Sequence, residues 1–200
     1  MLRHAFRTEG EPLRRSWRRR RVKPLRLVLV LDVSASMGVY ARALAQFAHA
    51  ATRSGGHVEA FAFGTRLTRI TAALRSPDPD AALGALGKAV PDWQGGTRIG
   101  ESLRELLDRW GRRGPVRGAV VVLCSDGLER GDPQLLAEQM RRLSRLARRI
   151  VWVNPLKGSP EYEPLAHGMA AALPYVHEFL AGHNLASLEE LASAVAKAGR

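Results

Sequence analysis

Two strongly apolar segments that each lead into an aspartate constrain the fold more than any other feature of the chain. Residues 25–31 read Leu-Arg-Leu-Val-Leu-Val-Leu and are followed by Asp32, and residues 119–124 read Ala-Val-Val-Val-Leu-Cys and are followed by Ser125-Asp126. Short runs that are apolar on both faces are typical of central strands in a parallel sheet. The sequence therefore predicts an α/β fold with these two strands in its interior.

Helical and strand-like segments alternate along the rest of the chain. The predicted strands cover 25–31, 57–63, 66–70, 119–124, 149–153 and 175–179, and the predicted helices cover 39–54, 79–90, 99–111, 133–145 and 187–198, with a further short helix before the last strand. This order predicts a Rossmann-like, open and mostly parallel β-sheet with helices on both faces. Residues 66–70 are predicted to form one short antiparallel edge strand in a hairpin with 57–63.

The positive charge of the chain is concentrated at its N-terminus. Residues 1–26 carry ten Lys and Arg residues and two acids, which supplies +8 of the net charge of +12. We therefore expect a basic arm at 1–24 and a single domain at 25–200, a length that suits one α/β core. The arm leaves nucleic-acid binding open as an alternative function. Nucleic acid is nevertheless an unlikely partner, because no nucleic-acid motif or aromatic-rich binding surface accompanies the arm.

Composition also bears on the cellular compartment. The chain has no apolar run near the roughly 20 residues that a membrane-spanning helix needs, and its N-terminus lacks the apolar core of a secretory signal. Cys124 is the single cysteine, so no internal disulfide can form. We expect a cytoplasmic protein without a membrane span.

Oxygen-bearing side chains follow the two apolar strands and a third loop. Asp32, Ser34 and Ser36 form a D-x-S-x-S pattern, Thr97 follows Gly95-Gly96, and Asp126 lies in Ser125-Asp126-Gly127. Ligands of open parallel sheets bind outside the carboxyl ends of the strands, so these loops are expected to converge there. Trp93, just before the glycines, is expected either against this site or in the core.

These oxygens predict a site for a hard cation, Mg²⁺ with Mn²⁺ as the other possibility. Ser34, Ser36 and Thr97 are expected to bind the ion directly, and Asp32 and Asp126 either directly or through water. Because hydroxyls are neutral, they leave the ion electron-poor. An open coordination position would then attract a carboxylate from a partner protein.

Enzymatic alternatives lack the residues that they need. An aspartate after a first strand can be a phosphoryl-accepting nucleophile, but the acid expected two residues later is Ser34 in this chain. The sequence contains neither a phosphate-binding G-x-x-x-x-G-K-[ST] loop nor a G-x-S-x-G nucleophile turn. We therefore expect a protein that is not an enzyme.

The five residues together resemble the metal-ion-dependent adhesion site (MIDAS) of von Willebrand factor A (VWA) domains. Asp32, Ser34 and Ser36 match the D-x-S-x-S element, Thr97 matches the lone threonine, and Asp126 matches the final aspartate. The resemblance covers about residues 25–198 and implies the VWA fold and metal-dependent protein binding. Ala35 stands where many members have glycine, and we expect the turn to accommodate this small side chain.

A narrower resemblance is to the CoxE-like group of bacterial VWA proteins. It rests on the Arg-rich segment before Pro24, on the D-x-S-x-S element, and on Gly95-Gly96-Thr97-Arg98-Ile99-Gly100, Cys124-Ser125-Asp126-Gly127 and Val151-Trp152-Val153-Asn154-Pro155-Leu156. The resemblance implies a MoxR-type AAA+ ATPase as partner. It also implies a role in maturation of a metal-cofactor enzyme such as molybdenum-containing carbon monoxide dehydrogenase. Members often have a longer N-terminal region than the arm seen here.

Overall fold

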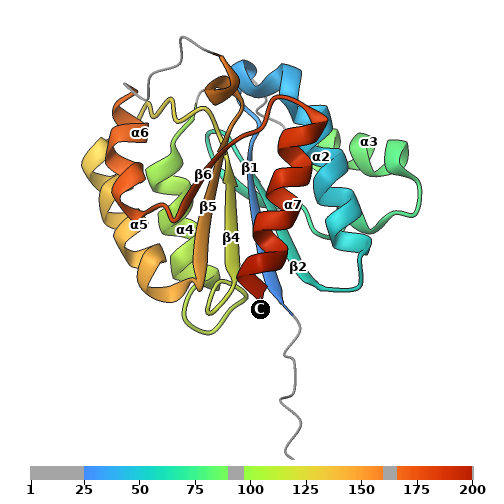
Figure 1. Ribbon diagram of the computed structural model, residues 1–200, viewed down its shortest axis with the longest axis horizontal. Coiled ribbons are helices and arrows are strands. Elements are labelled where there is room, and N and C mark those ends of the chain that lie inside the picture. Colours follow the sequence, from blue (N-terminus) through green and yellow to red (C-terminus); the bar gives the residue numbers. More distant parts are fainter. Residues whose placement is uncertain (1–24, 90–96, 160–165, 200) are drawn as a thin grey trace, which may run out of the picture.

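The computed structural model describes residues 25–89, 97–159 and 166–199. The basic arm predicted at 1–24, Trp93 and the Gly95-Gly96 turn lie outside the described residues. The strands are β1 (Arg26–Asp32), β2 (His57–Phe63), β3 (Leu67–Arg69), β4 (Val120–Cys124), β5 (Arg149–Asn154) and β6 (Glu178–Ala181) (Figure 1). The α-helices are α2 (Gly38–Arg53), α3 (Pro79–Ala89), α4 (Ile99–Trp110), α5 (Pro133–Leu146), α6 (His167–Ala172) and α7 (Leu185–Gly199).

The six strands form one sheet in the order β3-β2-β1-β4-β5-β6. Every neighbouring pair is parallel except β2 and β3, which are antiparallel. The predicted Rossmann-like architecture with one short antiparallel edge strand is therefore confirmed. The two apolar segments occupy the centre, where Leu31 of β1 pairs with Cys124 of β4, so both strands end at the same edge of the sheet.

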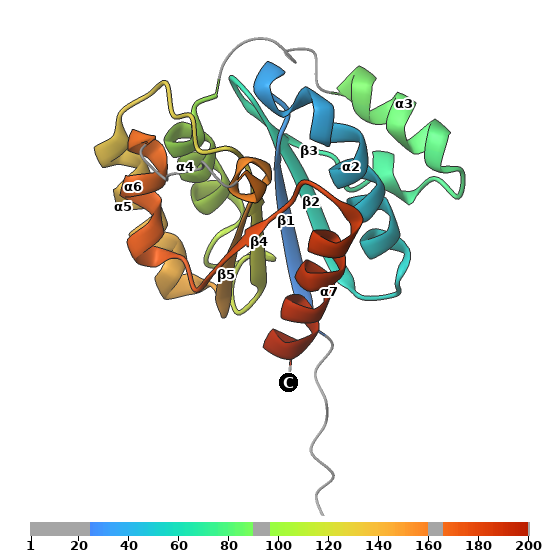
Figure 2. The ribbon, with the colours of Figure 1, turned by 45° about the horizontal axis from the view of Figure 1, so that its top comes forward.

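Alternate side chains of β1 enter two separate apolar cores. Leu27, Leu29 and Leu31 lie in the core beneath α2 and α7, whereas Val28 and Val30 lie in the core beneath α4, α5 and α6. Successive side chains of a strand point to opposite faces of the sheet, which explains the continuous apolar run. Figures 1 and 2 show the same arrangement, with α2, α3 and α7 on one face and α4, α5 and α6 on the other.

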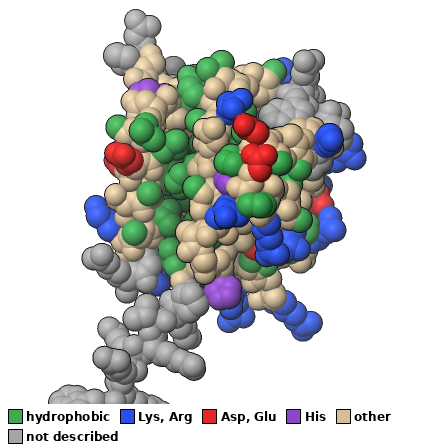
Figure 3. All heavy atoms as spheres, turned by 90° about the vertical axis from the view of Figure 1, so that its right-hand side faces the viewer, with side chains coloured by type: hydrophobic (Ala, Val, Ile, Leu, Met, Phe, Trp, Pro, Cys, Tyr) green, Lys and Arg blue, Asp and Glu red, His purple; other side chains and the backbone are tan. Residues whose placement is uncertain are grey.

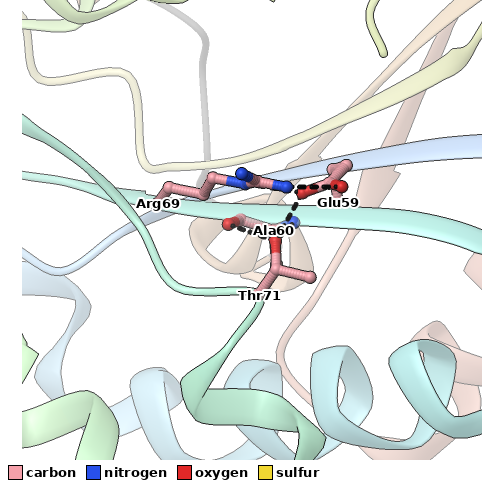
Figure 4. Close-up of polar contacts among 4 residues, drawn as sticks. All are labelled: Glu59, Ala60, Arg69 and Thr71. Carbon is pink, nitrogen blue, oxygen red and sulfur yellow. Dashed lines mark hydrogen bonds and ion pairs between the residues drawn. The ribbon is translucent and has the colours of Figure 1, made fainter.

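A cluster of polar contacts ties the edge hairpin to the sheet (Figure 4). Arg69 of β3 donates two hydrogen bonds of 2.8 Å to the Glu59 carboxylate of β2. The Thr71 hydroxyl donates to the same carboxylate at 2.7 Å and accepts from the Ala60 backbone N–H at 2.9 Å. Arg69 is an exposed charged residue on the edge strand β3, a position where charge discourages pairing with other chains.

The last strand was predicted three residues too early. Residues 175–179 alternate like a strand, but Leu173–Tyr175 form a 3₁₀ turn with a proline in its first positions, and β6 begins at Glu178 opposite Val151. Proline fixes its backbone in a turn-compatible conformation and cannot donate to a ladder. The other boundaries that lie within the described residues, including those of β3, agree with the prediction to within two positions. In the part of the chain that the structure describes, no helix is long and apolar enough to cross a membrane.

Candidate metal site

The candidate site lies where the order of the strands reverses. From β1 the chain continues outward to β2 and β3 on one side, and then returns to β4 on the other side of β1. A crevice forms at such a switch point, outside the carboxyl ends of the strands. Asp32 is the last residue of β1, Asp126 follows β4, and Thr97 precedes α4. Figure 2 turns this edge of the sheet toward the viewer.

Asp32 is the centre of the hydrogen-bond network at this edge. Its side chain is buried, at 1% exposure. Oδ1 accepts from the Ser34 backbone N–H at 2.9 Å and from the Thr97 hydroxyl at 3.4 Å, and Oδ2 accepts from the Ser125 hydroxyl at 2.6 Å. Asp32 thus fixes three loops relative to one another.

The two serines of the D-x-S-x-S segment lie side by side. Their hydroxyl oxygens are 3.1 Å apart, with Ser34 buried and Ser36 exposed. A 3₁₀ turn over Ala35–Met37 brings them together, and the Met37 backbone N–H donates to the Ser34 carbonyl at 3.0 Å. Ala35 has an exposed side chain in this turn, a setting that alanine tolerates.

The loop that carries Thr97 is held from both sides. Thr97 is buried, at 3% exposure. The Arg98 backbone N–H donates to the Gly64 carbonyl at 3.2 Å, and the Arg130 backbone N–H donates to the Thr97 carbonyl at 2.9 Å. The hydroxyl of Thr97 is therefore positioned by the turn after β2 and by the loop after β4.

Asp126 has a buried side-chain oxygen without a hydrogen-bond partner among the described residues. It is buried at 2% exposure, and its Oδ1 accepts from the Leu128 backbone N–H at 3.0 Å. Its Oδ2 is also buried, yet it has no hydrogen-bond partner among the described residues. A buried, unpaired carboxylate oxygen is costly, and such groups are usually paired or bound to a metal.

Three residues that sequence reasoning missed position the Asp126 loop. The Ser125 hydroxyl bonds Asp32 and also accepts from the Gly127 backbone N–H at 3.1 Å. Trp152 Nε1 donates to the Ser125 carbonyl at 2.9 Å, and Asn154 Nδ2 donates to the Asp126 carbonyl at 3.0 Å. The sequence signal for Trp152 and Asn154 is that each carries a polar group near the end of an otherwise apolar strand.

The electrostatics of the two carboxylates favour a cation. Burial is the largest effect on Asp32 and raises its pKa above the ordinary value of 3.8. The hydrogen bonds from Ser125 and Ser34 act in the opposite direction, and the negative charge of Asp126 raises the pKa of Asp32 further. Asp126 is thus close enough to repel Asp32, and a positive ion between the loops would relieve that repulsion.

The donor set fits a hard cation. Within the described residues, no group of three or more His, Cys, Asp or Glu side chains could hold a metal ion. The atoms brought together are carboxylate and hydroxyl oxygens, which suit Mg²⁺ or Mn²⁺ better than softer ions. The structure brings Asp32, Ser34, Ser36 and Thr97 into direct contact, and Ser125 links Asp126 to them.

Solved structures share this fold across most of the described chain. A von Willebrand factor type A protein from Catenulispora acidiphila aligns with a TM-score of 0.62 and 18% identity, over 88% of this chain and 43% of that one. Proximal thread matrix protein 1 from the mussel byssus, with a zinc-occupied MIDAS motif, aligns with a TM-score of 0.57 and 13% identity, over 88% and 48%. BatB from Bacteroides thetaiotaomicron aligns with a TM-score of 0.57 and 14% identity, over 87% and 98%.

These likenesses define the fold as that of a VWA domain. The chain spans less than half of the Catenulispora and mussel proteins. Among curated proteins, none matches its sequence. Residues 1–188 match the family described as VWA domain containing CoxE-like protein, and the chain belongs to that family.

Proposed function

We propose that the protein is a metal-ion-dependent protein-binding module and not an enzyme, with Asp32, Ser34, Ser36, Thr97 and Asp126 as its metal site. The observation that carries this proposal is the buried Asp126 Oδ2, which lacks a partner among the described residues and lies on a loop tied to Asp32 by Ser125. In this proposal, residues 1–24 are a basic arm and residues 25–200 are one domain. We also predict that the protein is located in the cytoplasm.

Each residue has a distinct task in this proposal. Ser34, Ser36 and Thr97 offer neutral hydroxyl oxygens, and Asp126 offers its unpaired Oδ2. Both oxygens of Asp32 already accept hydrogen bonds, so Asp32 orients the hydroxyls and supplies negative charge nearby. Mg²⁺ or Mn²⁺ bound there supplies a Lewis-acidic position for a partner's carboxylate oxygen. The zinc-occupied MIDAS of the mussel protein supports metal binding by such a site.

The surroundings of the site suit a protein partner. The large hydrophobic side chains that are exposed in the described part of the chain are Val39, Leu128, Leu156 and Leu185. Each follows the carboxyl end of a different strand, after β1, β4, β5 and β6 respectively. Exposed apolar side chains gathered at one edge are typical of an interaction surface. We therefore expect the partner's acidic residue to be flanked by apolar side chains.

The partner that membership of the CoxE-like family favours is a MoxR-type AAA+ ATPase. In this proposal the two proteins act together in maturation of a metal-cofactor enzyme, for which molybdenum-containing carbon monoxide dehydrogenase is the example. The task of the VWA domain would be to hold the ATPase or the client through a metal-bridged carboxylate.

The test is binding of the purified MoxR-type ATPase from the same organism to the full chain. The ATPase needs Mg²⁺ itself, so the metal is kept constant and the variants Asp126→Asn and Asp80→Asn are compared. Asp80 is an exposed aspartate on α3 and serves as the matched control. We expect Asp126→Asn to weaken binding by about tenfold or more, the usual effect of disturbing a metal site. Equal binding by the native protein and both variants would contradict the proposal.

A further inference from the structure

A strongly basic groove lies between the C-terminal ends of α4 and α5. Its volume is about 640 Å³, within the range of ligand pockets. Its charged lining consists of five arginines and one acid, namely Arg109, Arg112, Arg113, Arg142, Arg145 and Asp108. The same groove includes Leu107 and Leu146, which add apolar surface to its walls. Its lining is therefore suited to an anionic ligand that also has apolar parts.

Three of the five arginines have no partner within the described residues. Arg142 pairs with Asp108 at 2.7 Å, and Arg109 pairs with Glu105 at 2.6 Å. The side chains of Arg112, Arg113 and Arg145 are exposed and make no hydrogen bond or ion pair with another described residue. Arginines near helix C-termini can be favoured by the helix dipole. Arg145 lies in the last turn of α5, where this effect applies, but Arg112 and Arg113 lie beyond the end of α4.

The groove lies at the end of the molecule opposite the candidate metal site. Both α4 and α5 start at the edge of the sheet that holds Asp32 and Asp126, and they end at the opposite edge. A second groove of about 410 Å³ at that opposite edge shares Arg113 and adds Arg26 and Arg75. The one acid in its lining, Glu59, is already paired with Arg69. Figure 3 shows the side of the molecule that carries α2 and α3, away from the first groove, with several Lys and Arg side chains along its lower part.

We propose that the groove around Arg112, Arg113 and Arg145 binds an acidic segment of a partner protein, separately from the metal site. Charge complementarity identifies the occupant, because guanidinium groups form bidentate contacts with Asp and Glu carboxylates. Single-stranded nucleic acid is a poorer fit, because its binding sites usually offer aromatic side chains for stacking. The aromatic residue next to this groove, Trp110, is covered by the Arg109 guanidinium at 4.5 Å from its ring centre.

The experiment measures binding of a short fluorescein-labelled poly-glutamate peptide to the full chain in EDTA. EDTA removes any contribution from the metal site, so this test is independent of the proposed function. The groove variant is Arg112→Gln/Arg113→Gln/Arg145→Gln. The matched control is Arg53→Gln/Arg104→Gln/Arg141→Gln, which removes the same charge from three exposed arginines outside both grooves. The N-terminal arm is present in every protein and contributes equally.

We expect the groove variant to lose about tenfold in peptide affinity and the control to change by less than about twofold, since isolated surface charges contribute little. Circular dichroism should show both variants folded, because none of the six side chains forms an ion pair with a described residue. A labelled oligothymidylate is measured in parallel. Equal losses in both variants, no peptide binding by the native chain, or a larger loss for the oligonucleotide than for the peptide would each overturn the proposal.

Discussion

The Ser125 hydroxyl donates a 2.6 Å hydrogen bond to Asp32 Oδ2, across 93 positions of sequence. This bond joins the ends of β1 and β4 at the point where the strand order reverses. It also occupies the second oxygen of Asp32, whereas Asp126 Oδ2 has no partner in the described part of the chain. Asp126 is therefore the better placed of the two carboxylates for direct contact with an ion, and Asp32 for orienting its neighbours.

The first prediction concerns metal binding alone. Mg²⁺ or Mn²⁺ at a hundred times its dissociation constant should stabilise the native protein by about 2.7 kcal/mol, which is several degrees in Tm. Asp126→Asn should abolish this gain, because it replaces the unpaired carboxylate with a neutral amide. Thermal melting with metal and with EDTA provides the measurement, and the exposed Asp80→Asn should respond like the native chain. A native protein that melts at the same temperature in both conditions would refute the metal site.

The second prediction concerns pH in metal-free protein. Burial raises the pKa of Asp32, so the folded state binds this proton more tightly than the unfolded chain. The contribution of Asp32 to stability is then greatest below its ordinary pKa of 3.8 and is lost as the pH rises through the folded-state pKa. In EDTA, Asp32→Asn should therefore gain stability relative to the native protein as the pH rises above about 4, as measured by urea unfolding. A difference in unfolding free energy that does not vary with pH would contradict this.

The third prediction compares two glycines with similar backbone conformations. Gly127 has φ +82° and Gly118 has φ +70°, but only at Gly127 would a Cβ overlap another side chain, that of Met169. Gly118→Ala should cost about 1–2 kcal/mol for the left-handed conformation. Gly127→Ala should cost clearly more, because the overlap adds to this strain and displaces the Asp126 loop. Chemical denaturation measures both costs, and equal costs would show that Met169 moves aside without penalty.

The fourth prediction concerns the single cysteine. Burial raises the pKa of the Cys124 thiol to about 12, and the charge of Asp32 adds to the effect. Because the thiolate is the reactive form, the native protein should react very slowly with a disulfide reagent near pH 8. Unfolding in urea should restore rapid reaction of one thiol per chain. Rapid labelling of the folded protein would show that the end of β4 opens to solvent.

The sequence predicted the central strands and the site loops for a clear physical reason. A strand buried on both faces must be apolar throughout, so the polar residues that follow it stand out, as Asp32 and Asp126 do. The mostly parallel sheet, its antiparallel edge hairpin and the helices on both faces followed from the alternation of elements, and the structure bears them out. Whether the five residues hold a metal stays a prediction that the first experiment tests.

The residues that support the site could not be predicted in the same way. Trp152 and Asn154 act on the backbone of the neighbouring β4 loop, and this relation appears only once the register of β5 against β4 is known. The start of β6 was predicted too early because the 3₁₀ turn that contains Pro174 extends to Tyr175, and pairing with β5 starts at Glu178. Local periodicity does not contain this tertiary information.

The length of β1 has a consequence for how the protein works. Its seven residues separate the two edges of the sheet by about 20 Å, at roughly 3.3 Å per residue. A partner's carboxylate bound at the metal site of Asp126 and an acidic segment bound at Arg113 would thus be kept apart by the rigid sheet. Two proteins, or two segments of one protein, could bind at once. Where the two segments belong to one protein, binding of one would raise the effective concentration of the other.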